Sequence, residues 1–140
     1  MGTKQLTVFV ENKHGALSEI TKLLTAAGVN IRAMVLADTP DYGILRMIVS
    51  DTAGASEALS AGGILHKVVG ITVIRLENTP GGLSSVLDTL VAHNINIEYM
   101  YAFVAVSGRD AYAALRFEDK DAALAVLAKE KIPILEAEAL

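Results

Sequence analysis

The chain has 140 residues, of which 52% are hydrophobic and 20% charged, and this composition excludes an intrinsically disordered protein. The formal net charge of −4 argues against a nucleic-acid partner, because binding to a phosphate backbone depends on Lys and Arg. The absence of cysteine excludes disulfides and thiolate metal sites and fits a cytoplasmic protein, and no apolar run approaches the roughly 20 residues that span a membrane.

The first half of the chain predicts a strand, a helix, two strands, a second helix and a last strand. Alternating apolar residues indicate the strands, and apolar residues spaced three and four apart indicate the first helix. Gly28 is expected to end that helix in the left-handed conformation, and Asp51 is an expected N-cap. The expected elements are a strand through Leu6, Val8 and Val10, a helix from Leu17 to Ala27, strands at about 29–37 and 44–49 around a turn at 38–41, a short helix after Asp51 and a strand at about 64–69.

The second half repeats the first. At an offset of 66 residues, nine of the 21 positions from 11 to 31 recur as the same residue, and later in the repeat the offset becomes 68. Asn94 and Asp119 then take the places of Gly28 and Asp51. The expected elements are a strand through Thr72, Ile74 and Leu76, a helix from Leu83 to Val91, strands at about 95–106 and 111–117 around a turn at 107–110, a helix after Asp119 and a strand at about 132–136.

Two βαββαβ units predict an α+β chain made of two ferredoxin-like repeats, one in residues 1–70 and one in residues 71–140. Each repeat is expected to hold an antiparallel sheet with both helices on one face. The second strands, around 34–36 and 99–104, are apolar on both faces, which is unusual for an edge exposed to solvent. We therefore expect these edges to pair and to join the repeats into one continuous antiparallel sheet of eight strands.

A short motif occurs at the start of the first helix in both repeats, as Asn12–Leu17 and Asn78–Leu83. The unpaired amides and the dipole of a helix N-terminus favour an anion, and a glycine lets a ligand approach the backbone closely. An asparagine offers both a donor and an acceptor, and Asn30 and Asn96 repeat that offer at the second strand. A free α-amino acid needs donors for its carboxylate and acceptors for its ammonium group, so the motif predicts such a ligand.

The Asn-x-x-Gly-x-Leu segment, followed by Val/Ile-Asn-Ile at the next strand, resembles the ACT domain family over essentially the whole chain, as two consecutive copies. The resemblance implies a regulatory protein without catalytic activity that binds an amino-acid effector between paired modules. A homodimer is also expected. His14 departs from the family pattern, which has Pro there. The ligand-binding residues that the resemblance implies are Asn12, Gly15, Ala16, Leu17, Asn30, Ile31, Asn78, Gly81, Gly82, Leu83, Asn96 and Ile97.

The same residues also fit purely structural roles. Asn12 and Asn78 are also typical helix N-caps, and the two motif glycines are also typical turn residues. Asn30 and Asn96 are equally typical of residues that follow a helix end. His66 and His93 have no partner at metal-ligand spacing, so neither a metal nor another cofactor is expected.

Two other functions compete with amino-acid binding by an independent regulatory protein. The alternative is a regulatory subunit of a separate amino-acid biosynthetic enzyme, such as acetolactate synthase, with the open sheet face as the protein interface. An enzyme is not expected, because the sequence has no cysteine, no Ser-His pair at a nucleophile turn, no paired carboxylates around a motif and no phosphate loop.

Overall fold

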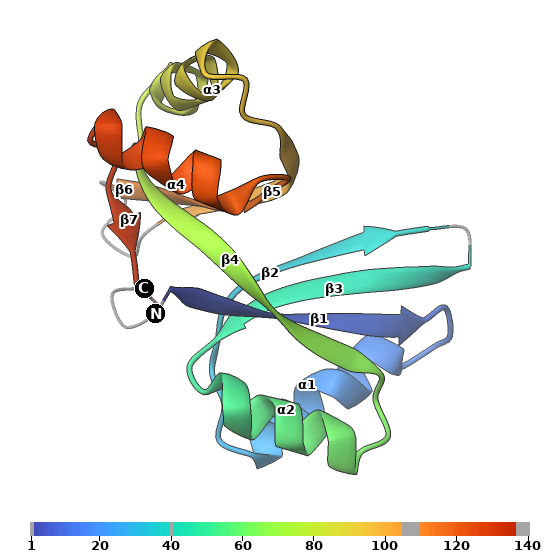
Figure 1. The fold of residues 1–140 in the computed structure, drawn as a ribbon. Coiled ribbons are helices and arrows are strands. Elements are labelled where there is room, and N and C mark those ends of the chain that lie inside the picture. The colour runs from blue at the N-terminus through green and yellow to red at the C-terminus, as the bar shows by residue number, and fades with distance from the viewer. Residues whose placement is uncertain (1, 40, 105–109, 137–140) are drawn as a thin grey trace. The chain divides into compact units, whose positions relative to one another are not determined.

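The computed structural model of the chain describes residues 2–39, 41–104 and 110–136. It divides into two compact units, the N-terminal unit Lys4–Gly70 and the C-terminal unit, which consists of Ile71–Leu140 with Met1–Thr3. Each unit combines two helices with strands of a sheet (Figure 1). The expected turn residues Pro40 and 107–109, the end of the strand expected at 95–106, and the last residues, 137–140, lie outside the described residues.

The N-terminal unit has the expected order of strand, helix, strand, strand, helix and strand. Its elements are β1 (Thr3–Glu11), α1 (Ala16–Ala26), β2 (Ile31–Asp38), β3 (Tyr42–Val49), α2 (Thr52–Ala61) and the first part of β4 (His66–Glu77). The strand order of this sheet is β2-β3-β1-β4, which makes β2 an outer strand. β1 and β2 both pair antiparallel with β3.

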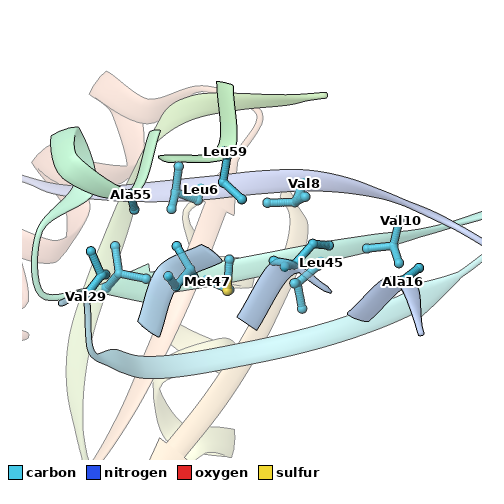
Figure 2. Close-up of a cluster of buried hydrophobic side chains, with 12 residues drawn as sticks. Leu6, Val8, Val10, Ala16, Val29, Leu45, Met47, Ala55 and Leu59 are labelled. Atoms are coloured by element: carbon cyan, nitrogen blue, oxygen red, sulfur yellow. The ribbon is translucent and has the colours of Figure 1, made fainter. Parts of the chain in front are cut away.

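The core of the N-terminal unit lies between the sheet and its two helices. Every second side chain of β1 from Leu6 to Val10 is buried, as are Leu45 and Met47 on β3 (Figure 2). The helices add Ile20, Leu24, Ala55 and Leu59, among others, to this cluster. Full burial of each large aliphatic side chain stabilises the folded state by about 1.5–3 kcal/mol. The apolar residues that recur with strand and helix periodicity in the sequence therefore supply the main stabilisation of this unit.

The C-terminal unit repeats this architecture. Its elements are the rest of β4, then α3 (Gly82–Ala92), β5 (Ile97–Val104), β6 (Asp110–Phe117), α4 (Lys120–Lys129) and β7 (Ile134–Leu135). Its strand order is β7-β4-β6-β5, and all three pairings are antiparallel. Ile74, Leu90, Leu115 and Leu127 form the centre of its core. The ferredoxin-like α+β fold expected from the sequence is therefore confirmed.

The expected helix ends are also confirmed. Gly28 and Asn94 follow the first helix of their units with φ angles of 72° and 59°, in the left-handed region. Asp51 and Asp119 are the N-caps of α2 and α4, and each carboxylate accepts a hydrogen bond from a first-turn backbone amide, at 3.0 Å and 3.1 Å respectively. Each of the helices α1 to α4 therefore has one end at the residue expected from the sequence. These ends were predictable because each depends only on residues close in sequence.

The expectation of eight strands joined through the two second strands is wrong. The last strand of the first repeat and the first strand of the second are one continuous strand, β4, of 12 residues, so the sheet has seven strands in the described part of the chain. Val68–Ile71 contains no turn-forming pair, and Gly70 is not among the residues with positive φ, so nothing there reverses the chain. β2 and β5 are instead the outer strands of their units' sheets.

Within the ranges that the structure describes, no helix is long and apolar enough to cross a membrane. In the same ranges, no group of three or more His, Asp or Glu side chains is placed to hold a metal ion.

Candidate functional site

The loop between β1 and α1 turns through a left-handed glycine. Gly15 is the N-cap of α1 with φ 82°, and no described side chain caps this helix. The amide of Ala16 donates to the carbonyl of Lys13 at 3.3 Å, which closes the turn. The interpretation of Asn12 as the helix N-cap is therefore wrong, because Gly15 holds that position. The interpretation of Gly15 as a turn glycine is confirmed by its φ angle.

The loop between β4 and α3 has the same backbone. Gly81 is the N-cap of α3 with φ 88°, again without a side-chain cap among the described residues. The amide of Gly82 donates to the carbonyl of Thr79 at 3.0 Å. Asn78 is thus not the N-cap either, and the turn interpretation of Gly81 holds. In both units the first-turn amides of the helix have no acceptor within the helix, as at every helix N-terminus.

A cavity of about 280 Å³ borders the β1–α1 loop. Residues at the end of β1, in the loop and at the start of α1 line it, together with residues at and beside the turn between β2 and β3. These are Glu11, Asn12, Lys13, Ala16 and Leu17, and Leu36, Asp38, Thr39 and Tyr42. The cavity therefore presents a cation, carboxylates and apolar side chains together. The Lys13 Nζ lies 3.2 Å from Glu11 Oε2, and both groups are exposed.

A cavity of about 370 Å³ borders the β4–α3 loop. Thr79 and Gly81 from the loop and Gly82 and Ser85 from α3 line it, together with the charged residues Arg75, Glu77 and Lys131. The two loops thus share a backbone and border cavities of different charge. Two cations and one carboxylate line the cavity of the C-terminal unit, whereas one cation and two carboxylates line that of the N-terminal unit.

The expected residues at the second strands lie far from these loops. In the N-terminal unit, Glu11 pairs with Tyr42 at one end of β3, whereas Ile31 pairs with Val49 at its other end. Seven residues of strand separate the two ends, about 23 Å at 3.3 Å per residue. Figure 1 shows the β1–α1 loop at the arrowhead end of β1 and the start of β2 at the opposite end of the unit. Asn30 therefore does not meet Asn12 within one unit.

The same separation holds in the C-terminal unit, where Glu77 pairs with Asp110 and Ile97 with Phe117. Here the side chain of Asn96 has a protein partner: its Nδ2 donates to Glu118 Oε2 at 3.1 Å. Ile31 and Ile97 pack against the cores of their units, as do Leu17 and Leu83. The structure thus brings Asn12, Gly15, Ala16 and Leu17 together at one loop and Asn78, Gly81, Gly82 and Leu83 at the other, and it separates both groups from the asparagines and isoleucines of the second strands.

The β2–β3 turn contributes to the first cavity and was not expected to. Leu36, Asp38, Thr39 and Tyr42 reach it because the start of β3 pairs with the end of β1. The signal that could have indicated them is the strand order: in a ferredoxin-like unit, the second and third strands turn at the end of the sheet where the first strand meets its helix.

The comparisons with known proteins agree with this fold. The family model for the ACT domain pair matches residues 1–140. Protein BT0572 from Bacteroides thetaiotaomicron is 37% identical in a match that covers 98% of this chain and 94% of that one, with a TM-score of 0.92. More distant solved structures share the fold. The regulatory subunit of aspartate kinase from Thermus thermophilus, in its ligand-free form, is 16% identical over 91% of each chain, with a TM-score of 0.66. A structure of aspartokinase alpha and beta subunits is also 16% identical, over 99% of this chain and 94% of that one, with a TM-score of 0.63. The two likenesses at 16% identity show the fold alone. No curated protein sequence matches the chain.

Proposed function

The chain belongs to the ACT domain pair family, whose fold serves regulation, and from that premise we propose that it is a regulatory protein that binds a free amino acid at its β1–α1 and β4–α3 loops. The proposal includes a cytoplasmic location, a homodimer and a chain that is not an enzyme. Its binding contacts are the loop residues described above together with the asparagines at the second strands.

The observation that carries this proposal is the difference between the helices within each unit. α2 and α4 begin at an aspartate whose carboxylate accepts a hydrogen bond from one first-turn amide. α1 and α3 begin at left-handed glycines without a described side-chain cap. The carboxylate of an amino acid would take the place that the aspartate holds in the other two helices, and the helix dipole would favour it.

The remaining groups of the first cavity suit the rest of an amino acid. The carboxylates of Glu11 and Asp38 and the side-chain carbonyl of Asn12 are acceptors for an ammonium group. Leu36 and Tyr42 offer apolar surface to a side chain. The cavity thus supplies donors, acceptors and apolar contact within about 280 Å³, which is enough space for a small amino acid.

A site that also uses Asn30 requires a second module. When two strands pair antiparallel, the start of one lies beside the end of the other. β2 ends next to the first cavity and is an outer strand, with Met34 42% and Leu36 48% exposed. Edge-to-edge pairing of β2 with the outer strand of a second copy would therefore bring the partner's start of β2 or β5 to this cavity. This arrangement places the ligand between two modules.

Calorimetric titration of the chain with each of the twenty amino acids tests the proposal, with light scattering to follow the oligomeric state. We expect one amino acid or a few related ones to bind with saturation. At a ligand concentration 100 times the Kd, binding should stabilise the folded state by about 2.7 kcal/mol and raise the Tm accordingly. The absence of binding by all twenty would overturn the proposal.

The second candidate is a regulatory subunit of a separate amino-acid biosynthetic enzyme, such as acetolactate synthase. The exposed apolar side chains of β2 favour it, because they suit a protein partner as well as a second copy. Capture of tagged chain from native extract, with and without branched-chain amino acids, distinguishes the two. Recovery of a stoichiometric biosynthetic enzyme supports the subunit, and recovery of the chain alone supports the independent regulator.

A further inference from the structure

Ser56 on α2 and His66 at the start of β4 form a hydrogen-bonded pair in the N-terminal unit. The Ser56 Oγ lies 2.8 Å from His66 Nε2, and His66 Nδ1 lies 2.9 Å from the carbonyl oxygen of Ile64. A carbonyl only accepts, so these partners assign the proton of the neutral ring to Nδ1. Nε2 is then an acceptor, and the Ser56 hydroxyl donates to it.

The sister repeat shows that the fold does not require this pair. At the offset of 68 residues, Leu124 and Ile134 stand where Ser56 and His66 stand in the first repeat. The alignment is sound at this point, because the neighbouring core positions Ala55 and Leu59 correspond to Ala123 and Leu127 and all four are fully buried. The same helix-to-strand connection is therefore built with two apolar residues in one unit and with a hydroxyl and an imidazole in the other.

The serine of the pair borders open space. Ser56 lines a cavity of about 520 Å³ with Thr52, Ala53, Glu57 and Ser60 from α2, Lys4 from β1 and Val68 from β4. Ser56 and His66 are each half-buried. Lys4 and Glu57 are the charged groups of this cavity, and none of the β1–α1 loop residues lines it. A small reagent can thus reach Ser56 without occupying the amino-acid site.

We propose that Ser56 is a nucleophilic serine with His66 as its general base, an acyl-acceptor site for small activated esters. A hydroxyl within hydrogen-bond reach of a base that is itself oriented by a third group is the arrangement of activated nucleophiles, and the Ile64 carbonyl is that third group here. The Ser56 oxygen forms a bond to the acyl carbon while its proton passes to His66 Nε2. The bond from the acyl carbon to the leaving oxygen then breaks, and His66 returns the proton to that oxygen. The products are acylated Ser56 and an alcohol.

Labelling with a fluorophosphonate probe, followed by intact mass and peptide mapping, tests the proposal. We expect one adduct, located at Ser56, with loss of fluoride. Ser56→Ala should abolish it, and His66→Gln should slow it roughly 100-fold, the usual contribution of a general base. Ser60→Ala is the matched control, since Ser60 lines the same cavity on the same helix, and it should label as the wild type does. No adduct in the wild type, or equal labelling in His66→Gln, would overturn the proposal.

A thiol in place of the hydroxyl gives a second measurement that does not depend on the probe. The chain has no cysteine, so Ser56→Cys and Ser60→Cys each carry a single thiol. We expect the thiol at position 56 to react with iodoacetamide about tenfold faster than the thiol at position 60 near pH ~6.5, because a histidine partner favours the thiolate. His66→Gln in the Ser56→Cys background should remove that excess. Equal rates at the two positions, in variants with unchanged circular dichroism, would contradict a base at His66.

Discussion

The β1–α1 loop and the β4–α3 loop share a backbone but differ in how closely they are packed. Each enters its helix through a glycine with positive φ, Gly15 or Gly81. The next residue differs: Ala16 carries a buried methyl group, whereas a Cβ at Gly82 would collide with the carbonyl oxygen of Glu77. The Asn-x-x-Gly motif therefore encodes a turn, while the neighbouring residues decide how much room and what charge a ligand meets there.

The starts of the second strands, β2 and β5, also share a backbone arrangement but differ in their side-chain hydrogen bonds. The backbone pairing is equivalent, since the amide of Ser50 donates to the carbonyl of Asn30 and the amide of Glu118 donates to the carbonyl of Asn96. Glu118, however, also accepts from the Asn96 side chain, and Ser50 instead accepts from the backbone amide of Asn30 through its hydroxyl. The Asn96 carboxamide is thus already bonded within its unit, so we expect the two asparagines to contribute unequally to any ligand site.

Among the changes that compare the two loops, Gly82→Ala is expected to lower the free energy of unfolding the most. The new methyl group meets backbone, which cannot rotate away, so the loop has to shift. We expect the free energy of unfolding to fall by about 2–3 kcal/mol, the upper part of the range for overpacking. Ala16→Gly, the reciprocal change, should cost about 1 kcal/mol or less through helix propensity. Urea unfolding followed by circular dichroism measures both, and a Gly82→Ala variant as stable as the wild type would show that the two loops are interchangeable.

Gly15→Ala and Gly81→Ala test the part of the loops that is the same. A Cβ at either position meets nothing within 4 Å, so only the left-handed backbone opposes it. We expect each variant to lose about 1–2 kcal/mol, and by similar amounts in the two units. Gly15→Asn is the control that should lose less, because asparagine tolerates this conformation. A clearly larger loss in one unit would mean that the two turns are not equivalent.

Removing a true N-cap should cost less than forcing a side chain into a left-handed turn. Asp51→Ala and Asp119→Ala each remove a carboxylate that accepts from a first-turn amide. We expect each to lower the free energy of unfolding by about 1 kcal/mol, with Asp→Asn at the same positions nearly neutral because asparagine also caps. Thermal unfolding measures the series. If the Ala variants were as stable as the wild type, the aspartate caps would contribute nothing to the stability of α2 and α4.

Most of the fold was predictable because its signals are local. The apolar periodicities, the left-handed residues Gly28 and Asn94 and the caps Asp51 and Asp119 each act within a few residues of chain, and the structure confirms them. The continuity of β4 was not predictable in this way. Its residues have the same strand pattern whether the chain runs on or reverses at Gly70, and only the absence of a turn decides between the two.

The candidate site was predictable only as two loops. The motif predicted turn glycines at Gly15 and Gly81, and both have the left-handed backbone of such turns. The distance from Asn12 to Asn30, however, depends on strand register, which a single sequence does not give. The pairing of Ser56 with His66 depends likewise on how α2 returns to β4. Local turns can therefore be predicted from the sequence, whereas contacts between side chains far apart in the sequence require the three-dimensional structure.

Asn12→Ala is expected to have the smallest effect on stability of these changes, and it tests most directly whether the β1–α1 loop binds a ligand. Asn12 is exposed and is not the N-cap of α1, so the free energy of unfolding should change by less than about 0.5 kcal/mol. If the side chain contacts the ligand, the loss of one hydrogen bond should weaken binding of the amino acid about tenfold, equivalent to about 1.4 kcal/mol. Thr25→Ala, at the far end of α1, is the matched control and should leave the affinity unchanged. A variant that binds as tightly as the wild type would assign Asn12 to the turn alone and leave the backbone amides and the charged groups of the cavity as the binding contacts of this loop.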